Sequence, residues 1–259
     1  MNLTRILVVA SNVFREVIRD RVLYLIGFFA IALIGASVLL PEVSGGSGDK
    51  IILDLGLAAI SLLGLAIAIF IGTGLISKEI EKRTVYVMIA KPISRAEFIM
   101  GKHWGLSAVL VVLVSAMMVI YLGVLTFRQV AYPLDSLLWA ALFQILELSL
   151  IAAVALLFGV FTNSLLAMLL TVAVYLTGHF SRDLLSLGKL AKDASLQTIT
   201  ETLYLILPDL ARLDLKNQAV YGMSLLPSPL ELVENFAYGV IYIALLLAIA
   251  TFIFSRRQF

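Results

Sequence analysis

Long apolar stretches with few charged residues recur along the chain and are separated by shorter polar segments. About 20 consecutive apolar residues cover the hydrocarbon core of a bilayer, so these stretches predict membrane-spanning helices. Only the polar turn at Thr162, Asn163 and Ser164 divides the fourth stretch from the fifth, which is the shortest. We expect an all-α membrane protein whose single transmembrane domain covers residues 1–259. Its predicted spans are approximately 22–40, 52–76, 104–126, 137–161, 164–180 and 236–255.

Residues 3–17 have a different pattern, in which apolar and polar positions alternate with helical spacing. Ile6 and Val13 fall on one side of a helix, with Arg5 and Glu16 on the other. This two-sided pattern is typical of a helix that lies in the membrane interface. The alternative is a cytoplasmic extension of the first span.

The composition supports a membrane location and excludes several kinds of chemistry. The chain is 61% hydrophobic and 14% charged, whereas soluble domains are about one quarter charged. The net charge of +2 is spread over the chain without a dense basic and aromatic surface, so no nucleic-acid partner is expected. Because there is no cysteine, disulfides and thiolate-bound metals are excluded.

Basic residues in the short loops predict the orientation of the chain. They gather near both termini and between the second and third spans, so these parts are expected to be cytoplasmic. The long segment 181–235 is expected on the outer membrane face, where it would form short helices. The basic residues that carry this prediction are Arg5, Arg15, Arg19, Arg21, Lys78, Lys82, Arg83, Lys91, Arg95, Lys102, Arg256 and Arg257.

The cytoplasmic loop at 78–102 reads as a helix, a break and a second helix. Glu79 and Arg83 are spaced as an i,i+4 ion pair, and Pro92 interrupts the chain. Ser94 and Glu97 form the capping-box pattern that begins a helix leading into the third span. A charged and apolar elbow of this kind is suited to docking on another protein. The alternative is a solvated basic loop that only sets the topology.

This loop resembles the corresponding region of ABC-2 type ABC-transporter permeases, most closely the branch labelled multi-copper enzyme maturation permeases. The likeness lies in the run Lys91-Pro92-Ile93-Ser94-Arg95-Ala96-Glu97 and in Gly101-Lys102. The resemblance implies a type V exporter-like fold with a cytoplasmic coupling helix between spans 2 and 3. Many members have glycine where this chain has Arg83. The residues implied in coupling to an ATPase are Glu79, Lys82, Arg83, Lys91, Pro92, Ser94, Arg95, Glu97 and Lys102.

No motif for nucleotide binding or catalysis is present in the sequence. A P-loop needs a glycine-rich stretch ending in Gly-Lys-Ser/Thr, but Gly101-Lys102 is followed by His103. We therefore expect no enzyme and no cofactor in this chain, with ATP and Mg bound by a partner ATPase subunit. The resemblance also implies a second permease chain, identical or paralogous, membrane lipids as neighbours, and a multi-pass location in a prokaryotic cytoplasmic membrane.

Two acidic residues fall inside predicted spans, Asp54 and Glu147. Carboxylates within a membrane are costly and often functional, so both are candidates for a translocation pathway. The alternatives are a protonated or hydrogen-bonded Glu147 inside the bundle and an Asp54 at interface depth. His103 and His179 are expected at opposite membrane faces, where they could not share a metal ion, so no metal site is predicted.

The favoured function is that of a permease subunit of an ABC transporter, an exporter of an unidentified substrate. The rival is an ATPase-independent secondary carrier or an intramembrane enzyme that uses Glu147. A membrane scaffold that transmits mechanical work from ATP hydrolysis is the third hypothesis.

Overall fold

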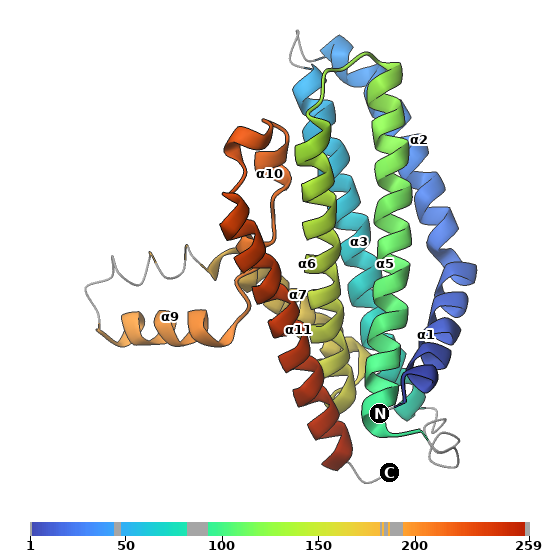
Figure 1. Ribbon diagram of the computed structural model, residues 1–259, viewed down its shortest axis with the longest axis vertical. Coiled ribbons are helices and arrows are strands. Elements are labelled where there is room, and N and C mark those ends of the chain that lie inside the picture. The colour runs from blue at the N-terminus through green and yellow to red at the C-terminus, as the bar shows by residue number, and fades with distance from the viewer. Residues whose placement is uncertain are drawn as a thin grey trace.

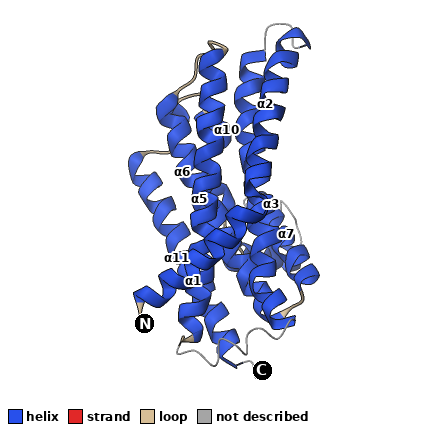
Figure 2. Cartoon of the chain, turned by 90° about the vertical axis from the view of Figure 1, so that its right-hand side faces the viewer, coloured by secondary structure: helices blue, strands red, loops and turns tan. Residues whose placement is uncertain are grey.

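A computed structural model of the chain describes residues 2–43, 48–81, 93–181, 183, 186 and 194–256. Long helices lie side by side in one bundle (Figure 1), and the described residues contain no strand (Figure 2). The helices are α1 (Leu3–Val17), α2 (Leu23–Val43), α3 (Gly48–Glu81), α5 (Arg95–Phe127), α6 (Leu134–Phe161), α7 (Ser164–His179), α9 (Ala194–Ile206), α10 (Lys216–Ala219) and α11 (Pro229–Arg256).

Five of the described helices are long and apolar enough to cross a membrane, namely α2, α3, α5, α6 and α11. The fifth predicted span corresponds to α7, which has only 16 residues. At 1.5 Å per residue it is about 24 Å long, shorter than the ~30 Å hydrocarbon core of a bilayer. The number of complete crossings therefore stays a prediction.

Helix α6 lies at the centre of the bundle, packed against α3, α5, α7 and α11. Its side chains are buried on every side from Leu146 to Leu156. A helix surrounded by other helices needs no polar face, which explains why apolar residues occur on every side of α6. By contrast, α2 and α11 expose large apolar side chains such as Tyr24, Ile31 and Ile241. Such surfaces are suited to contact with lipid or with another apolar helix.

Helix α1 packs closely against the first half of α5 at two glycines. A β-carbon built at Gly101 would lie 2.6 Å from Val9 Cβ, and one at Gly105 would lie 2.6 Å from the carbonyl oxygen of Ala10. The missing side chains let the two backbones approach, as small residues do at helix contacts in membranes. A π-helical turn, Ile18–Val22, joins α1 to α2.

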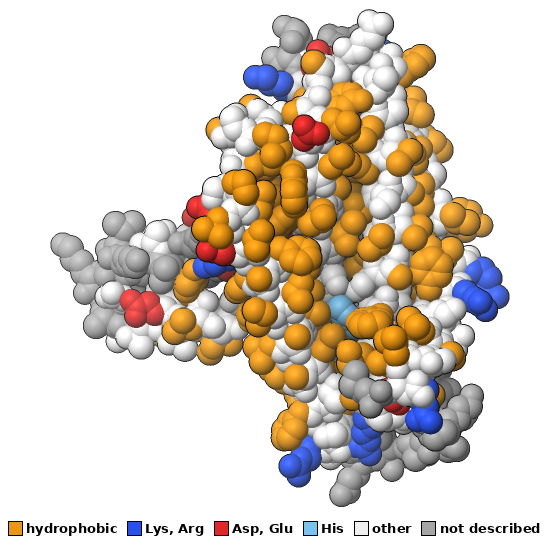
Figure 3. Space-filling model, in the orientation of Figure 1, with side chains coloured by type: hydrophobic (Ala, Val, Ile, Leu, Met, Phe, Trp, Pro, Cys, Tyr) orange, Lys and Arg blue, Asp and Glu red, His pale blue; other side chains and the backbone are white. Residues whose placement is uncertain are grey.

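The two termini lie at the same end of the bundle, the lower end in Figure 1. The end of α3 and the start of α5 lie there too. Figure 3 shows several Lys and Arg side chains at this end and apolar side chains over the sides of the bundle. The orientation of the termini relative to the membrane stays a prediction.

The segment 207–220 folds back into the bundle after α9, which projects from its side (Figure 1). Ser136 Oγ of α6 donates a hydrogen bond to the carbonyl of Ala219 at 2.7 Å. Gly178 of α7 makes room for the segment, because a β-carbon there would lie 2.8 Å from Leu210 Cγ. This position is deeper than the outer-face loop that the sequence led us to expect.

Candidate functional site

The start of α5 is fixed by the capping box that the sequence predicts. Ser94 Oγ accepts a hydrogen bond from the Glu97 backbone N–H at 3.2 Å, and Glu97 Oε2 accepts one from the Ser94 backbone N–H at 2.9 Å. These bonds satisfy N–H groups that a helix end otherwise leaves without partners. The helix that leads out of the 78–102 loop therefore begins at Arg95, as expected.

Glu97 also connects α5 to the beginning of α1. Its Oε1 accepts a hydrogen bond from the Asn2 backbone N–H at 2.6 Å, and its Oε2 lies 3.9 Å from an Arg5 guanidinium nitrogen. The Asn2 side chain in turn caps α1 by accepting from the Thr4 N–H at 3.0 Å. One carboxylate thus holds two helix starts together.

Lys102 joins the two helices that flank the loop. Its Nζ donates to Glu79 Oε1 at 2.6 Å, so α5 is linked to the last turns of α3. Lys102 is only 6% exposed. The sequence also predicts a pair between Glu79 and Arg83, and Arg83 lies outside the described residues, so that pair stays a prediction.

Arg95 connects the start of α5 to the end of α11. Its guanidinium donates to the carbonyl of Phe254 at 2.9 Å and to that of Ser255. Phe98 stacks on Phe254 with ring centroids 5.8 Å apart. A cation near the last carbonyls of a helix also interacts favourably with the helix dipole.

We call Asn2, Glu79, Arg95, Glu97 and Lys102 the helix-end network. It connects α1, α3, α5 and α11 at the end of the bundle that carries the 78–102 loop. Four residues expected to couple to an ATPase lie outside the described residues, namely Lys82, Arg83, Lys91 and Pro92. The other five, including Ser94, lie within this network or cap its central helix.

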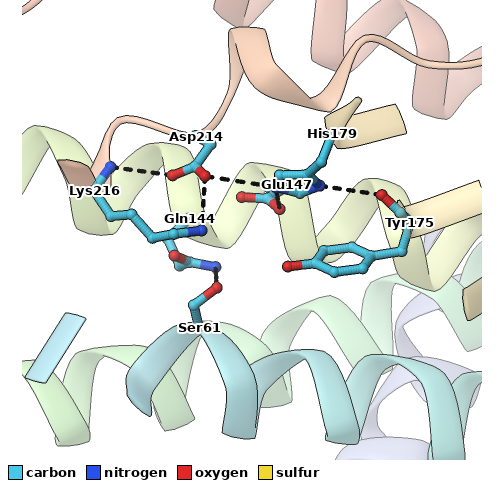
Figure 4. Close-up of polar contacts among 7 residues, drawn as sticks. All are labelled: Ser61, Gln144, Glu147, Tyr175, His179, Asp214 and Lys216. Carbon is cyan, nitrogen blue, oxygen red and sulfur yellow. Dashed lines mark hydrogen bonds and ion pairs between the residues drawn. The ribbon is translucent and has the colours of Figure 1, made fainter. Parts of the chain in front are cut away.

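A second group of polar residues lies in the interior, beside the middle of α6 (Figure 4). Glu147 of α6 is fully buried. His179, at the end of α7, places its Nε2 3.3 Å from Glu147 Oε1 and 3.5 Å from Asp214 Oδ2. Lys216 of α10 completes the group. We call Glu147, His179, Asp214 and Lys216 the polar cluster.

Asp214 and Lys216 form the tightest ion pair of the polar cluster, with Nζ 2.7 Å from Oδ2. Burial raises the pKa of Asp214, but the neighbouring His179 and the Lys216 ammonium outweigh it and lower the pKa to about 2. Burial likewise lowers the pKa of Lys216, and the Asp214 carboxylate outweighs this and raises it. Both side chains are therefore charged at neutral pH.

Glu147 is the unusual member of the polar cluster. Among the described residues, no group makes an aligned hydrogen bond with either carboxylate oxygen of Glu147, although His179 lies within ion-pair distance. A buried charge without hydrogen bonds is strongly unfavourable. The pair can relieve this cost by sharing a proton, so Glu147 and His179 are equipped for proton exchange.

A small cavity of about 10 Å³ lies next to the polar cluster. Gln144 and Lys216 supply its polar wall, and the remaining wall is mostly apolar. Gln144 Nε2 also donates to Ser61 Oγ of α3 at 3.3 Å. A space of this size holds about one water molecule, so no substrate-sized site opens here in this conformation.

The structure separates the two acidic candidates. Asp54 is exposed on α3, whereas Glu147 lies in the interior with partners that come from later segments. The expected placement of the histidines at opposite faces is wrong. His103 Nε2 lies 3.0 Å from the Ser149 carbonyl, and His179 lies beside Glu147. The two histidines therefore contact α6 at positions only two residues apart on that helix. Among the described residues, no group of His, Asp and Glu is arranged to hold a metal ion.

Sequence reasoning missed His179, Asp214 and Lys216 as partners of Glu147. Asp214 and Lys216 lie 35 and 37 residues after His179, the last residue of α7, so no local sequence pattern links them to Glu147.

Residues 7–259 match the family described as "ABC-2 family transporter protein". A search of curated proteins found no match. The family match includes every described helix except the first residues of α1.

Proposed function

The chain belongs to the ABC-2 transporter family as a membrane-spanning permease subunit, and we propose that it is an exporter driven by a separate ATP-hydrolysing subunit. The observation that carries this proposal is the family match, whose bounds, residues 7–259, include the 78–102 loop. The given sequence contains no P-loop, so this proposal assigns ATP hydrolysis to a separate subunit.

We propose that the 78–102 loop receives the motion of the ATPase. The helix-end network supports this role, because a displacement of the loop acts on α3 and α5 together through Lys102 and Glu79. Glu97 extends the connection to α1, and Arg95 extends it to α11. A push at one end can therefore move several helices as a unit, as rigid-body switching requires.

The complete transporter in this proposal contains two permease chains, identical or paralogous, and two ATP-binding subunits that hold ATP and Mg. It lies in a prokaryotic cytoplasmic membrane with both termini and the 78–102 loop in the cytoplasm. The resemblance to the multi-copper enzyme maturation branch stays part of the proposal and does not identify the cargo.

Purification of the tagged chain from native membranes, in a detergent that preserves complexes, tests the partner. We expect a P-loop ATPase to copurify in a near-stoichiometric amount. Repeated isolation of an intact permease without any ATPase would refute the proposal.

Charge reversal tests the loop itself. Lys91→Glu and Arg95→Glu should reduce the ATPase activity that the permease stimulates, or abolish binding of the ATPase. Because Arg95 also binds the end of α11, each variant needs a thermal unfolding measurement that shows retained fold. Arg128→Glu, at the exposed opposite end of α5, is the matched control and should behave like wild type. Unchanged coupling in both loop variants would refute the roles of these two residues.

The rival function, a carrier or intramembrane enzyme that works without an ATPase, draws on the buried polar cluster. It predicts that Glu147→Gln abolishes activity in a preparation free of any ATPase. Activity that depends wholly on ATP would exclude the rival and leave the transporter and the mechanical scaffold, which proteoliposome transport of candidate cargo then distinguishes.

A further inference from the structure

His179 has a defined tautomer in the polar cluster. Its Nδ1 lies 3.1 Å from the Tyr175 carbonyl oxygen. A carbonyl can only accept, so Nδ1 carries a hydrogen and donates it. Any further proton on the ring must therefore sit on Nε2, the nitrogen that faces Glu147 and Asp214 (Figure 4).

Without that further proton, the geometry is unfavourable. An uncharged Nε2 would then lie 3.3 Å from the Glu147 carboxylate and 3.5 Å from the Asp214 carboxylate. A proton on Nε2 makes the contact with Glu147 an ion pair, and a proton on Glu147 removes the charge of that carboxylate. The arrangement thus fits a state in which neutral His179 and charged Glu147 have taken up one additional proton between them.

The charge balance leads to the same conclusion. Asp214 and Lys216 form an ion pair and cancel each other. The net charge of Glu147 and His179 is then zero if the pair holds one proton in addition to the one on Nδ1. It is minus one if the pair holds no additional proton. An uncompensated negative charge in a buried site is costly, so the occupied state is the one compatible with the packed interior.

The net charge around Glu147 depends on the described groups that surround it. Helix α7 contributes Tyr175 and His179, and the 207–220 segment contributes Asp214 and Lys216. The neutral side chains of Gln144 on α6 and Ser61 on α3 complete the surroundings (Figure 4). The balance between one proton and none is therefore set within the polar cluster.

We propose that the polar cluster is a binding site for one exchangeable proton, shared by Glu147 and His179, whose presence keeps the 207–220 segment docked on α6 and α7. Loss of the proton leaves Glu147 and Asp214 as like charges on either side of Nε2. Moving Asp214 away relieves this repulsion, and Asp214 belongs to the segment that packs through Leu210 and Leu213. Release is a local opening of this segment rather than unfolding of the bundle.

This inference goes beyond the transport proposal and does not depend on it. The chain contains no cysteine, so spin labels can be placed at chosen positions without background. Asn217 on α10 and Arg128 at the end of α5 are both exposed. A double variant, Asn217→Cys with Arg128→Cys, reports the position of the segment through the label-to-label distance measured by pulsed electron resonance in lipid nanodiscs.

We expect one docked distance at acidic pH and a second population, with a changed distance, that grows as the pH rises. Glu147→Gln removes the carboxylate that needs the proton, so the labelled variant should stay docked over the same pH range. Asp214→Asn provides a second test in case Glu147→Gln does not fold, because the remaining charges then balance without the proton. A pH-independent distance in the wild-type chain would overturn the proposal, as would an unchanged pH response in both variants.

The proton itself can be followed at its binding site. The chain has two histidines, so isotope-labelled histidine gives two sets of ring signals, and His103→Gln assigns them. We expect the His179 Nε2 signal to change over the same pH range as the distance and to respond to Glu147→Gln. A His179 signal that titrates identically with and without Glu147 would refute the shared proton.

Discussion

Replacing Gly105 by alanine should push α1 away from α5. The new β-carbon would lie 2.6 Å from the carbonyl oxygen of Ala10 and 2.7 Å from Val13 Cβ. Non-bonded atoms settle at about 3.5–4.0 Å, so α1 has to move by about 1 Å. Because the obstructing atoms include backbone, rotation of one side chain cannot absorb the change.

The expected cost follows from two opposing effects. Alanine favours a helix over glycine by about 1 kcal/mol, whereas forcing an extra group into a packed contact costs about 1–3 kcal/mol. The net result for Gly105→Ala is a loss of roughly 0–2 kcal/mol in the free energy of unfolding. Gly123, on the same helix, has nothing within 4 Å of an added β-carbon. Gly123→Ala should therefore be neutral or stabilising by up to about 1 kcal/mol.

Thermal unfolding of the two purified variants, followed by tryptophan fluorescence, measures this difference. Trp104 is adjacent to the substituted Gly105 and makes the signal sensitive to the α1 contact. We expect a lower Tm for Gly105→Ala and an unchanged or higher Tm for Gly123→Ala. Equal stabilisation of both variants would show that α1 is not packed against α5 as described.

Three further predictions concern the helix-end network and the polar cluster. Glu97→Gln should lower Tm more than Glu231→Gln, since both residues close capping boxes but only Glu97 also binds Asn2; equal shifts would contradict this. Lys216→Met should lower Tm by leaving the Asp214 carboxylate without its ammonium partner, and adding Asp214→Asn should restore part of the loss. The pKa of Asp214 in the folded protein, about 2, is below its ordinary value of 3.8. Above about pH 4, the charged carboxylate therefore contributes about 2 kcal/mol to the free energy of unfolding. That contribution is lost as the pH falls through about 2, so the difference in Tm between wild type and Asp214→Asn should narrow on acidification. A difference in Tm that stays constant would refute this role of the Asp214 charge.

The helices could be predicted from the sequence because their signals are local. Apolar length is enough to find α2, α3, α5, α6 and α11. Ser94 and Glu97 are three residues apart, so their capping-box pattern also predicts the start of α5, and the structure confirms it. Thr162 and Asn163 separate α6 from α7 as predicted, since Thr162 caps the end of one helix and Asn163 the start of the next.

The contacts of the candidate sites could not be predicted, because they join segments far apart in the chain. Lys102 meets Glu79 across the loop, at a sequence separation for which no local spacing rule predicts a contact. The polar cluster needs the 207–220 segment to turn back beside α6, and loop residues such as Asp214 carry no periodic signal that places them in the interior. The energetic cost of placing a carboxylate inside a membrane did identify Glu147 as a candidate, but it could not identify His179 as its neighbour.

The central claim is that an ATPase subunit docks on the 78–102 loop, and site-specific photo-cross-linking tests it most directly. A photoreactive amino acid at position 91, in the loop, is compared with one at Phe127, which is 87% exposed at the other end of α5. We predict a cross-link to a P-loop ATPase from position 91 and none from position 127. Cross-links to the ATPase from position 127, or from other cytoplasmic positions with none along 78–102, would contradict the claim.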